Sequence, residues 1–384
     1  MVLSERFLPG SGGSITWLYE TYRRFAPGKV VVVAGANGNT ELVDKTLPFK
    51  VERICMSMDD WDPTRPASFL SYLRMFLRVR KILRQYRLSQ IHCMKVLPEG
   101  MIACCLRYVA RVPYILYAHG EEIQMRLTSR KLGWLIPPLY KAAAKIIANS
   151  EHTKALLQEI GVPSARIHVI HPGVEAAAFQ FDEVTRRAVR QHYKLDGAPV
   201  LLTVGRLQRR KGQDMVIKAL LLIRKKYPDI KYLIVGGGEE LESLQLLAKE
   251  EGVQDNVIFT GRIPDEERSA YYAACDIFIM PNRQIGADIE GFGMVFLEAG
   301  AAGKPVIGGR SGGTGEAIQE GVTGMRVDGD NVEEIAAAVM DLLANSKKAH
   351  VMGEQGRLRV KTAFSWDSIV ARTRQVATAV NQGV

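Results

Sequence analysis

Residues 275–309 read CDIFIMPNRQIGADIEGFGMVFLEAGAAGKPVIGG. This stretch opens with a short apolar run, passes through a polar loop that contains glycine, and reaches a second apolar segment that Gly303 and Pro305 close. It ends on another apolar run, KPVIGG. A strand, a loop, a helix and a second strand in this order form the repeating unit of a parallel sheet covered by helices. The stretch therefore predicts an α/β fold.

The same alternation runs through most of the 384 residues. Short β-branched runs that end on glycine are separated by segments with helical periodicity. The pattern occurs twice, and HPGV at residues 171–174 is the expected joint. We therefore predict two tandem Rossmann-like domains, each a doubly wound parallel sheet, that face an interdomain cleft. The strand-like runs lie at residues 29–35, 90–94, 112–120, 145–150, 166–173, 199–206, 230–238, 256–262, 275–281 and 304–309.

Length and composition agree with two domains. The chain is long enough for two domains of roughly 150–200 residues, and its 47% hydrophobic content can fill their cores. No apolar run approaches the ~20 residues of a membrane span, and no signal-peptide pattern opens the chain. The five cysteines show neither a CxxC pair nor Cys/His metal spacing, which indicates free thiols. We therefore expect a cytoplasmic protein without a metal site.

The excess positive charge lies in the first half of the chain. The formal net charge is +10. Residues 1–172 hold 24 Lys and Arg against 13 Asp and Glu, a net charge of +11, whereas residues 173–384 hold 27 against 28, a net charge of −1. No acidic residue occurs between Asp62 and Glu99. An anionic surface or substrate is therefore expected to meet the first domain only.

Ligands of open parallel sheets bind beyond the carboxyl ends of the strands, so the residues directly after strands are the candidates. The first is the turn LPGSGGSITWL at residues 8–18, which only a short strand can precede. Gly12 and Gly13 allow a ligand to approach the backbone, and the helix N-terminus after them suits phosphate. The turn has neither GxGxxG spacing nor the Walker lysine, and a purely structural turn is the alternative.

Two cations follow the run at residues 199–206. Arg206 ends this run, and Lys211 lies five residues further on, beside a glycine. Cations at this edge can hold a diphosphate and stabilise the charge that builds on it as it leaves. The alternative is a basic surface loop, and Arg209 and Arg210 are expected to be solvated.

His119 follows the apolar run PYILYA. It is either a structural histidine or a polar group that contacts a substrate. Glu121 and Glu122 come soon after it, but they form no HExxH pattern, so a metal site is not expected here.

The loop and helix of the opening stretch carry the last candidates. The N–H groups of Phe292, Gly293 and Met294 would lie at the helix N-terminus, where anions bind. Glu290, on the loop before them, can accept hydrogen bonds from sugar hydroxyls, and Glu298 inside the helix suits the vicinal hydroxyls of a ribose. General acid/base hydrolysis by the two glutamates is the rival interpretation.

Taken together, these motifs resemble one family. The sequence is similar to the retaining nucleotide-sugar glycosyltransferases of the GT-B fold, glycosyltransferase family 4, and especially to bacterial phosphatidylinositol mannosyltransferases. The resemblance covers the chain from end to end in the family's order. The motifs that carry it are GG at 12–13, AHGEE at 118–122, NSEHT at 149–153, VIHPGV at 169–174, GRLQRRKGQD at 205–214 and the E-x7-E pattern of EGFGMVFLEA at 290–299.

The resemblance implies a role for each candidate. Arg206 and Lys211 would bind the donor diphosphate, and His119 would contact the transferring sugar. Glu290 would hold the donor sugar, which completes the expected catalytic set, and Glu298 would bind the ribose. The remaining donor-binding candidates are Gly12 and Gly13 at the phosphates, the backbone of Phe292, Gly293, Met294 and Val295, and Arg262 and Ile263 at the base.

The family also implies a reaction. A hexose would move from GDP-mannose or a UDP-sugar to an acceptor hydroxyl with retention of configuration, in the synthesis of cell-envelope glycoconjugates. The departing diphosphate would help to deprotonate the acceptor, which fits the lack of a candidate nucleophile. No cofactor and no metal would be needed, because Arg206 and Lys211 supply the positive charge. The acceptor would be lipid-linked, a glycan or a small molecule.

The segment FLSYLRMFLRVRKILRQYR, residues 69–87, is expected to form a basic amphipathic helix. Such a helix indicates peripheral contact with an anionic membrane, at the inner face of the plasma membrane. An ordinary domain helix with a solvated face is the alternative. The apolar arc comprises Met75, Phe76, Val79, Ile82, Leu83 and Tyr86, and the basic arc comprises Arg74, Arg78, Arg80, Lys81, Arg84 and Arg87.

The expected domain limits are residues 1–172 for an acceptor-binding domain and 173–363 for a donor-binding domain. The resemblance implies that residues 364–384 form a helix that packs back on the first domain. Two other functions remain open: a nucleotide-sugar epimerase of the same architecture, which needs no acceptor, and a basic nucleic-acid-binding protein. The chain lacks the aromatic-interleaved basic motifs of RNA-recognition domains, so no nucleic-acid partner is expected.

Overall fold

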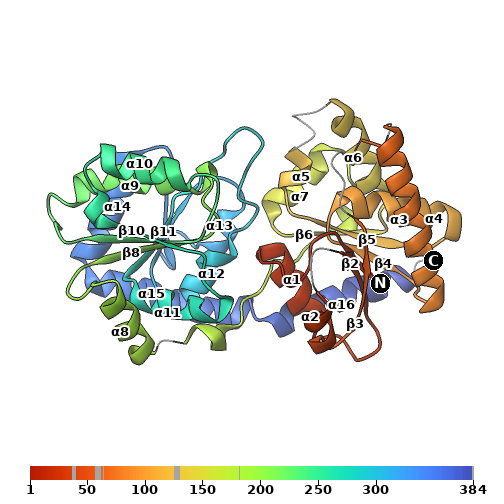
Figure 1. Ribbon diagram of the computed structural model, residues 1–384, viewed down its shortest axis with the longest axis horizontal. Coiled ribbons are helices and arrows are strands. Elements are labelled where there is room, and N and C mark those ends of the chain that lie inside the picture. The colour runs from red at the N-terminus through yellow and green to blue at the C-terminus, as the bar shows by residue number, and fades with distance from the viewer. Residues whose placement is uncertain (37–39, 57–61, 64, 125–129, 181, 383–384) are drawn as a thin grey trace. The chain divides into compact units, whose positions relative to one another are not determined.

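The structure, a computed structural model, describes the chain except residues 37–39, 57–61, 64, 125–129, 181 and 383–384. It divides into two compact units (Figure 1). Unit 1 contains Met1–Pro172 and Trp366–Val384, and unit 2 contains Gly173–Ser365. The first division falls within the HPGV segment, and the second lies two residues beyond the expected limit at residue 363.

Unit 1 is built on a parallel sheet of seven strands in the order β3-β2-β1-β4-β5-β6-β7. The strands are β1 (Val2–Ser4), β2 (Val31–Gly35), β3 (Lys50–Ile54), β4 (Ile91–Cys93), β5 (Tyr114–Ala118), β6 (Lys145–Ala148) and β7 (Ile167–Val169). The helices are α1 (Gly13–Tyr22), α2 (Glu41–Thr46), α3 (Pro66–Gln85), α4 (Met101–Ala110), α5 (Glu121–Gln124), α6 (Arg130–Ala142), α7 (Glu151–Glu159) and α16 (Trp366–Gln382).

Helices cover both faces of this sheet, and successive residues of its strands point to these faces in turn. On one side, Tyr114 and Leu116 of β5 belong to the core beneath α3, α4 and α6. On the other side, Tyr117 meets Trp17 of α1, with 5.1 Å between ring centroids. Strand β1 has only three residues, yet all are buried between β2 and β4. The glycine turn after it therefore starts from the centre of the sheet.

Unit 2 has a parallel sheet of six strands in the order β10-β9-β8-β11-β12-β13. The strands are β8 (Val200–Val204), β9 (Lys231–Val235), β10 (Val257–Gly261), β11 (Ile277–Met280), β12 (Val306–Gly309) and β13 (Gly324–Val327). The helices are α8 (Glu183–His192), α9 (Gln213–Ile223), α10 (Leu241–Glu250), α11 (Arg268–Ala274), α12 (Met294–Ala301), α13 (Thr314–Ala317), α14 (Val332–Ala344) and α15 (Ser346–Ala363).

Helices cover both faces of this second sheet (Figure 1), and each face has its own hydrophobic core. Leu201 of β8 packs with α9, α10 and α14, whereas its neighbour Leu202 packs with α11, α12 and α15. No helix in the described part of the chain is long and apolar enough to cross a bilayer.

In both sheets the strand order reverses beside the first strand, between β1 and β4 in unit 1 and between β8 and β11 in unit 2. Connections leave such a point toward opposite faces, which opens a crevice for a ligand at the carboxyl ends of the strands. The turn with Gly12 and Gly13 follows β1. Arg206 and Lys211 follow β8, and Glu290 follows β11. The topology thus makes neighbours of loops that are far apart in the sequence.

Candidate active site

In unit 2, the carboxylate of Glu290 is paired with two cations from the loop after β8. Lys211 Nζ and Arg210 Nη1 both donate to Glu290 Oε2, the arginine at 2.8 Å. Arg210 Nε also lies 2.8 Å from a carboxylate oxygen of Asp288. The prediction that Arg210 is solvated is therefore wrong, since its side chain is only 14% exposed. Glu290 can reach both cations because β8 and β11 are paired in the sheet.

The charges in this cluster depend on one another. Burial raises the pKa of Glu290, but the two cations outweigh burial and lower this pKa to about 2. Burial lowers the pKa of Lys211 by more than the attraction of Glu290 raises it. Glu290 is therefore a carboxylate at neutral pH and can accept hydrogen bonds from hydroxyl groups. A diphosphate would offer Lys211 and Arg210 a further anionic partner.

The loop that carries these cations is fixed by close backbone packing and by Arg283. Gly212 has a φ of +78°, and a Cβ atom there would lie 2.3 Å from the carbonyl oxygen of Pro281. The backbone N–H of Arg283 donates to the carbonyl of Arg210 at 2.8 Å, and its guanidinium donates to both oxygens of Asp214 at 2.9 and 2.6 Å. Arg283 was not among the predicted site residues, because no local pattern links it to a carboxylate 69 residues away.

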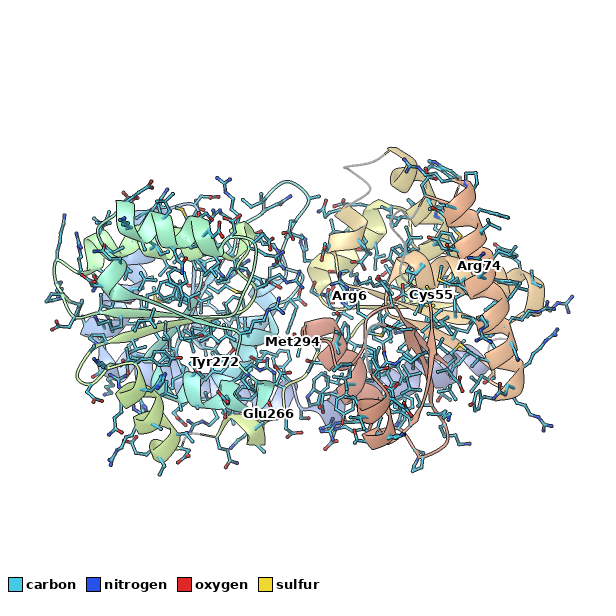
Figure 2. The ribbon with its side chains drawn as sticks, viewed as in Figure 1. Arg6, Cys55, Arg74, Glu266, Tyr272 and Met294 are labelled. Atoms are coloured by element: carbon cyan, nitrogen blue, oxygen red, sulfur yellow. The ribbon has the colours of Figure 1, made fainter. Side chains whose placement is uncertain are left out.

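Helix α12 begins at Met294, which Figure 2 labels, directly after Gly293. Gly293 has a φ of +88°, and a Cβ atom there would lie 2.5 Å from the ring of Phe296, so only glycine fits without displacing that ring. The first turn of a helix, here with Met294 and Val295, leaves N–H groups without intrahelical partners, and phosphate oxygens bind such groups. The side chain of Phe292 is buried in the core, and the backbone contact of this residue with a ligand stays a prediction.

Glu298 lies in a separate network. It is buried, accepts a hydrogen bond from the hydroxyl of Tyr272 at 2.7 Å, and pairs with Arg268 at 3.1 Å (Figure 2 labels Tyr272). The E-x7-E pattern thus places its two glutamates in different surroundings. A carboxylate has about four acceptor positions, so these two partners leave capacity for hydroxyl groups. The contact of Glu298 with a ribose stays a prediction.

Arg206, Arg262 and Ile263, three further predicted donor residues of unit 2, join neither network. Arg206 is exposed, and its side chain forms no hydrogen bond or ion pair with another described residue. Arg262 is also exposed, and its Nε lies 3.2 Å from the position that a Cβ atom of Gly237 would take. Ile263 is half-buried against the core beneath α11 and α12.

In unit 1, His119 follows β5 and is half-buried. Its ring Nε2 lies 2.9 Å from the carbonyl oxygen of Met94, and its ring meets that of Trp17 with 5.6 Å between centroids. Trp17 belongs to α1, which begins at Gly13, so the glycine turn and His119 lie at one edge of the same sheet. Gly12 has a φ of +137°, and open space lies where its side chain would stand.

The chemistry of unit 2 fits a ligand that carries both phosphates and hydroxyls. Lys211 and Arg210 suit phosphate oxygens, the first turn of α12 offers N–H groups, and Glu290 accepts from hydroxyls. Within the described ranges, no group of three or more His, Cys, Asp or Glu side chains is arranged to hold a metal ion.

Two family models match the chain in succession. The model described as Glycosyltransferase Family 4 matches residues 11–178, and the model described as Glycosyl transferases group 1 matches residues 185–359. The first match covers most of unit 1. The second covers most of unit 2, including the Glu290 cluster.

Two similar proteins are named mannosyltransferases, and a third is named a glycosyltransferase. A GDP-mannose-dependent alpha-(1-6)-phosphatidylinositol monomannoside mannosyltransferase of Mycolicibacterium smegmatis is 36% identical over 309 residues, which are 78% of this chain and 78% of the relative. A GDP-mannose-dependent monoacylated alpha-(1-6)-phosphatidylinositol monomannoside mannosyltransferase of Corynebacterium glutamicum is 28% identical over 98% of this chain and 97% of the relative. A D-inositol 3-phosphate glycosyltransferase of Acidothermus cellulolyticus is 33% identical over 60% of this chain and 52% of the relative.

Solved structures share the fold. HepE of Anabaena, crystallised in complex with UDP, has a TM-score of 0.85 at 19% identity and covers 98% of this chain and 99% of its own. Sucrose-phosphate synthase of Thermosynechococcus elongatus has a TM-score of 0.81 at 20% identity and covers 100% of this chain and 99% of its own.

Proposed function

Because the chain belongs to the family 4, group 1 glycosyltransferases and has their GT-B fold, we propose that it transfers mannose from GDP-mannose to a phosphatidylinositol-based glycolipid, with retention of configuration. The predicted family, fold class and general function, a nucleotide-sugar hexosyltransferase, are confirmed. The choice of GDP-mannose and of the acceptor is supported by the names of the relatives from M. smegmatis and C. glutamicum.

The Glu290 cluster is the observation that carries the proposal. A mannose hydroxyl would donate to Glu290, and the diphosphate would lie against Lys211 and the first turn of α12. One ligand can reach these groups because they follow neighbouring strands. Arg206 would bind the diphosphate from the start of its loop. The other proposed donor contacts are those of Gly12, Gly13, Arg262, Ile263, the backbone of residues 292–295, and Glu298.

In the transfer step, the acceptor oxygen forms a bond to C1 of the mannose while the bond from C1 to the diphosphate oxygen breaks. The acceptor proton passes to a diphosphate oxygen on the same face of the sugar, which retains the configuration. Lys211 and Arg210, which both donate to Glu290, would stabilise the charge on the departing GDP. In this proposal they supply the positive charge without a metal, and His119 contacts the transferring sugar.

The donor is tested first by thermal unfolding with GDP, UDP, ADP and their sugar conjugates in the presence of EDTA. A rise in Tm with GDP ligands alone supports the proposed donor, because a ligand that binds only the native state stabilises it. No rise with any nucleotide would count against the donor site. Labelled GDP-mannose should then yield a mannolipid with phosphatidylinositol monomannoside as acceptor. Conversion of the donor without acceptor would favour the epimerase instead.

Helix α3 supports contact with a membrane, though not through the apolar arc that the sequence suggested. Met75, Val79 and Ile82 of that arc are buried in the core of unit 1. A second apolar stripe lies on the outside of the same helix, which carries Arg74 (Figure 2). Its residues are Phe69, Leu70, Leu73 and Leu77, which are 57, 49, 42 and 53% exposed, and they lie among the exposed Arg74, Arg78, Lys81 and Arg84.

We propose that this outer stripe docks on an anionic bilayer, with the leucines in the interface and the basic residues at the headgroups. Flotation with vesicles of phosphatidylcholine and phosphatidylinositol at low salt tests it. The double change Leu73→Ser and Leu77→Ser should lower vesicle affinity about tenfold or more. Val184→Ser with Leu246→Ser, on exposed helix surfaces of unit 2, is the matched control. A wild type that does not float would refute the docking.

A further inference from the structure

His119 is held at three points by residues from three different connections. Its ring Nε2 lies 2.9 Å from the carbonyl oxygen of Met94, which follows β4. Its backbone N–H donates to Glu122 of α5 at 2.7 Å, and its carbonyl accepts from Asn149, directly after β6, at 3.0 Å. Both the ring and the peptide groups of this residue are therefore fixed by the surrounding fold.

The contact with Met94 decides which ring nitrogen carries the proton. A carbonyl oxygen only accepts hydrogen bonds, so Nε2 of His119 must donate. In a neutral imidazole, Nδ1 then has no proton and is an acceptor. A sugar hydroxyl can donate to such an acceptor. His119 is thus prepared to accept a hydrogen bond, as long as its backbone keeps the ring beside Met94.

Asn149 is the buried side chain that holds the carbonyl of His119. Its orientation is fixed from both ends: Nδ2 must face the His119 carbonyl, and Oδ1 accepts from Thr153 Oγ1 at 2.6 Å. Ser150 Oγ donates to the same oxygen at 3.3 Å and also caps α7 by accepting the N–H of Thr153. The NSEHT motif therefore starts a helix and presents one amide N–H to His119.

The VIHPGV motif continues this chain of hydrogen bonds. His171 Nδ1 lies 3.0 Å from the carbonyl oxygen of Asn149, so Nδ1 carries the proton here. The neutral tautomer of His171 is therefore opposite to that of His119. The next residue, Pro172, is the last before the chain enters unit 2. The contacts thus run from the point where the chain leaves unit 1 to His119.

We propose that Asn149 is a positioning residue for His119 and that His171 is the next link, so that the NSEHT and VIHPGV motifs act on sugar transfer through one hydrogen-bond chain. The inference rests on the proposed function, because it takes His119 to contact the transferring sugar. Asn149 acts by fixing the peptide that carries the imidazole. A displacement of about 1 Å in a positioned group can cost on the order of 10²-fold in rate.

Asn149→Asp is the sharpest test, because it keeps the shape of the side chain and replaces the donor by an acceptor. A carboxylate oxygen would then face the carbonyl of His119 without a proton between them, so the His119 peptide must move. Asn256→Asp is the matched control in unit 2. Asn256 is also buried, and its Nδ2 donates to the carbonyls of Pro228 and Ile230 at 3.1 and 2.8 Å.

The first readout needs no substrate. Nitrogen–proton correlation spectra of the imidazole rings should show the Nε2–H tautomer for His119 and the Nδ1–H tautomer for His171, with signals assigned from His119→Ala and His171→Phe. Asn149→Asp should shift the His119 signals, and Asn256→Asp should leave them unchanged. Unchanged His119 signals in Asn149→Asp would overturn the proposal. If this variant does not fold, His171→Phe, which removes the bond to Asn149, must shift the same signals.

The second readout is turnover of GDP-mannose with phosphatidylinositol monomannoside. Asn149→Asp should lower kcat roughly tenfold and leave KM within about threefold. In a His119→Ala background, Asn149→Asp should lower kcat by a further factor of less than about two, because the residue that Asn149 positions is absent. A full tenfold loss in that background would overturn the proposal. Shifted signals together with a wild type that transfers no mannose would refute the proposed function instead.

Discussion

In each unit a glutamate with a largely buried side chain follows a strand at the point where the strand order reverses, and the two carboxyl groups are in opposite states. Glu290 of unit 2 pairs with Lys211 and Arg210, which lower its pKa to about 2 against the effect of burial. Glu99 of unit 1 is 0% exposed and accepts one backbone N–H, that of Glu5, at 2.7 Å. Its other oxygen has no hydrogen-bond partner in the described part of the chain, and burial raises its pKa to about 8.

The difference shows that partners rather than burial decide the charge of a buried carboxyl group. Two cations keep Glu290 ionised where an anionic ligand is proposed to bind. For Glu99, backbone hydrogen bonding and the charge of Lys95 do not outweigh burial. The edge of the sheet in unit 2 is therefore a charged cluster, whereas in unit 1 neutral hydrogen bonds such as that from Asn149 to His119 form the framework.

Removal of Lys211 should have the largest effect. Lys211→Met leaves Glu290 with Arg210 alone and takes one charge from the proposed diphosphate site, so kcat with GDP-mannose should fall by about 10³. His119→Ala, at the neutral edge, should cost less, about 10². Initial rates at saturating donor measure both, with Tm as the control for folding. Equal losses would show that the charged and the neutral edge contribute alike.

Two adjacent arginines provide a matched pair of variants for the effect of cluster charge on kcat/KM. Arg210→Gln removes a guanidinium that is bound to Glu290 and Asp288, and kcat/KM should fall about tenfold. Arg209→Gln changes an exposed side chain, so its kcat/KM should stay within about twofold of the wild-type value. The measurement is kcat/KM for GDP-mannose in both variants. Similar values for the two would mean that the Glu290 cluster needs Lys211 alone.

Stability should depend on pH in opposite directions for the two glutamates. The pKa of Glu290 rises from about 2 in the folded state toward 4.5 on unfolding, so its contribution to the free energy of unfolding is lost as pH falls through that range. The pKa of Glu99 is about 8 in the folded state, so stability falls as pH rises from 4.5 to 8. The effect should be about 3 kcal/mol for Glu290 and about 5 kcal/mol for Glu99.

Urea denaturation between pH 3 and pH 8, compared with Glu290→Gln and Glu99→Gln, measures these two slopes. As pH rises from 3 to 5, the free energy of unfolding of the wild type should increase relative to that of Glu290→Gln. From pH 5 to 8, the free energy of unfolding of the wild type should decrease relative to that of Glu99→Gln. Differences that run parallel for both variants would contradict the contrast between the charged and the neutral edge.

Two glycines between β11 and α12 should show smaller effects on stability than the two glutamates. Gly286 has a φ of +59°, and open space lies where a Cβ atom would stand. Gly286→Ala should therefore lower the free energy of unfolding only by the strain of a left-handed alanine, about 1 kcal/mol. Gly293 has a φ of +88°, and a Cβ atom there would lie 2.5 Å from the ring of Phe296. Gly293→Ala should therefore lower the free energy of unfolding by about 2 kcal/mol. Thermal unfolding compares the two. Equal losses of stability would mean that the ring of Phe296, at the N-terminus of α12, moves aside at little energetic cost.

Local patterns predicted most of the framework. Each of the ten strand-like runs contains a strand, and Lys211 and Glu290, both placed after strands, meet in the structure. Strands β3 and β13 were not predicted. Both lie at the edges of their sheets, and their sequences KVERI and GMRV mix charged with apolar residues, so they lack the apolar run of a central strand.

Pairings between distant side chains had no signal in the sequence. Arg210 lies one residue from Lys211 and 80 residues from Glu290, and only the pairing of β8 with β11 shows that it is bound rather than solvated. The outer stripe of α3 was hidden for a related reason. Periodicity finds the arc that packs into the core, and the exposure of Leu73 and Leu77 becomes visible only when that core is assembled.

The sequence by itself determined two parallel-sheet domains, the loops in which ligand-binding residues follow strands, and the ordered motifs of a glycosyltransferase. Alternation and motif order are local properties, which a linear chain displays in full. The tertiary structure alone decided that Glu290 is charged while Glu99 is neutral, and that Asn149 holds His119. Those outcomes depend on which strands become neighbours and on how much water burial removes, and both arise only when distant segments pack together.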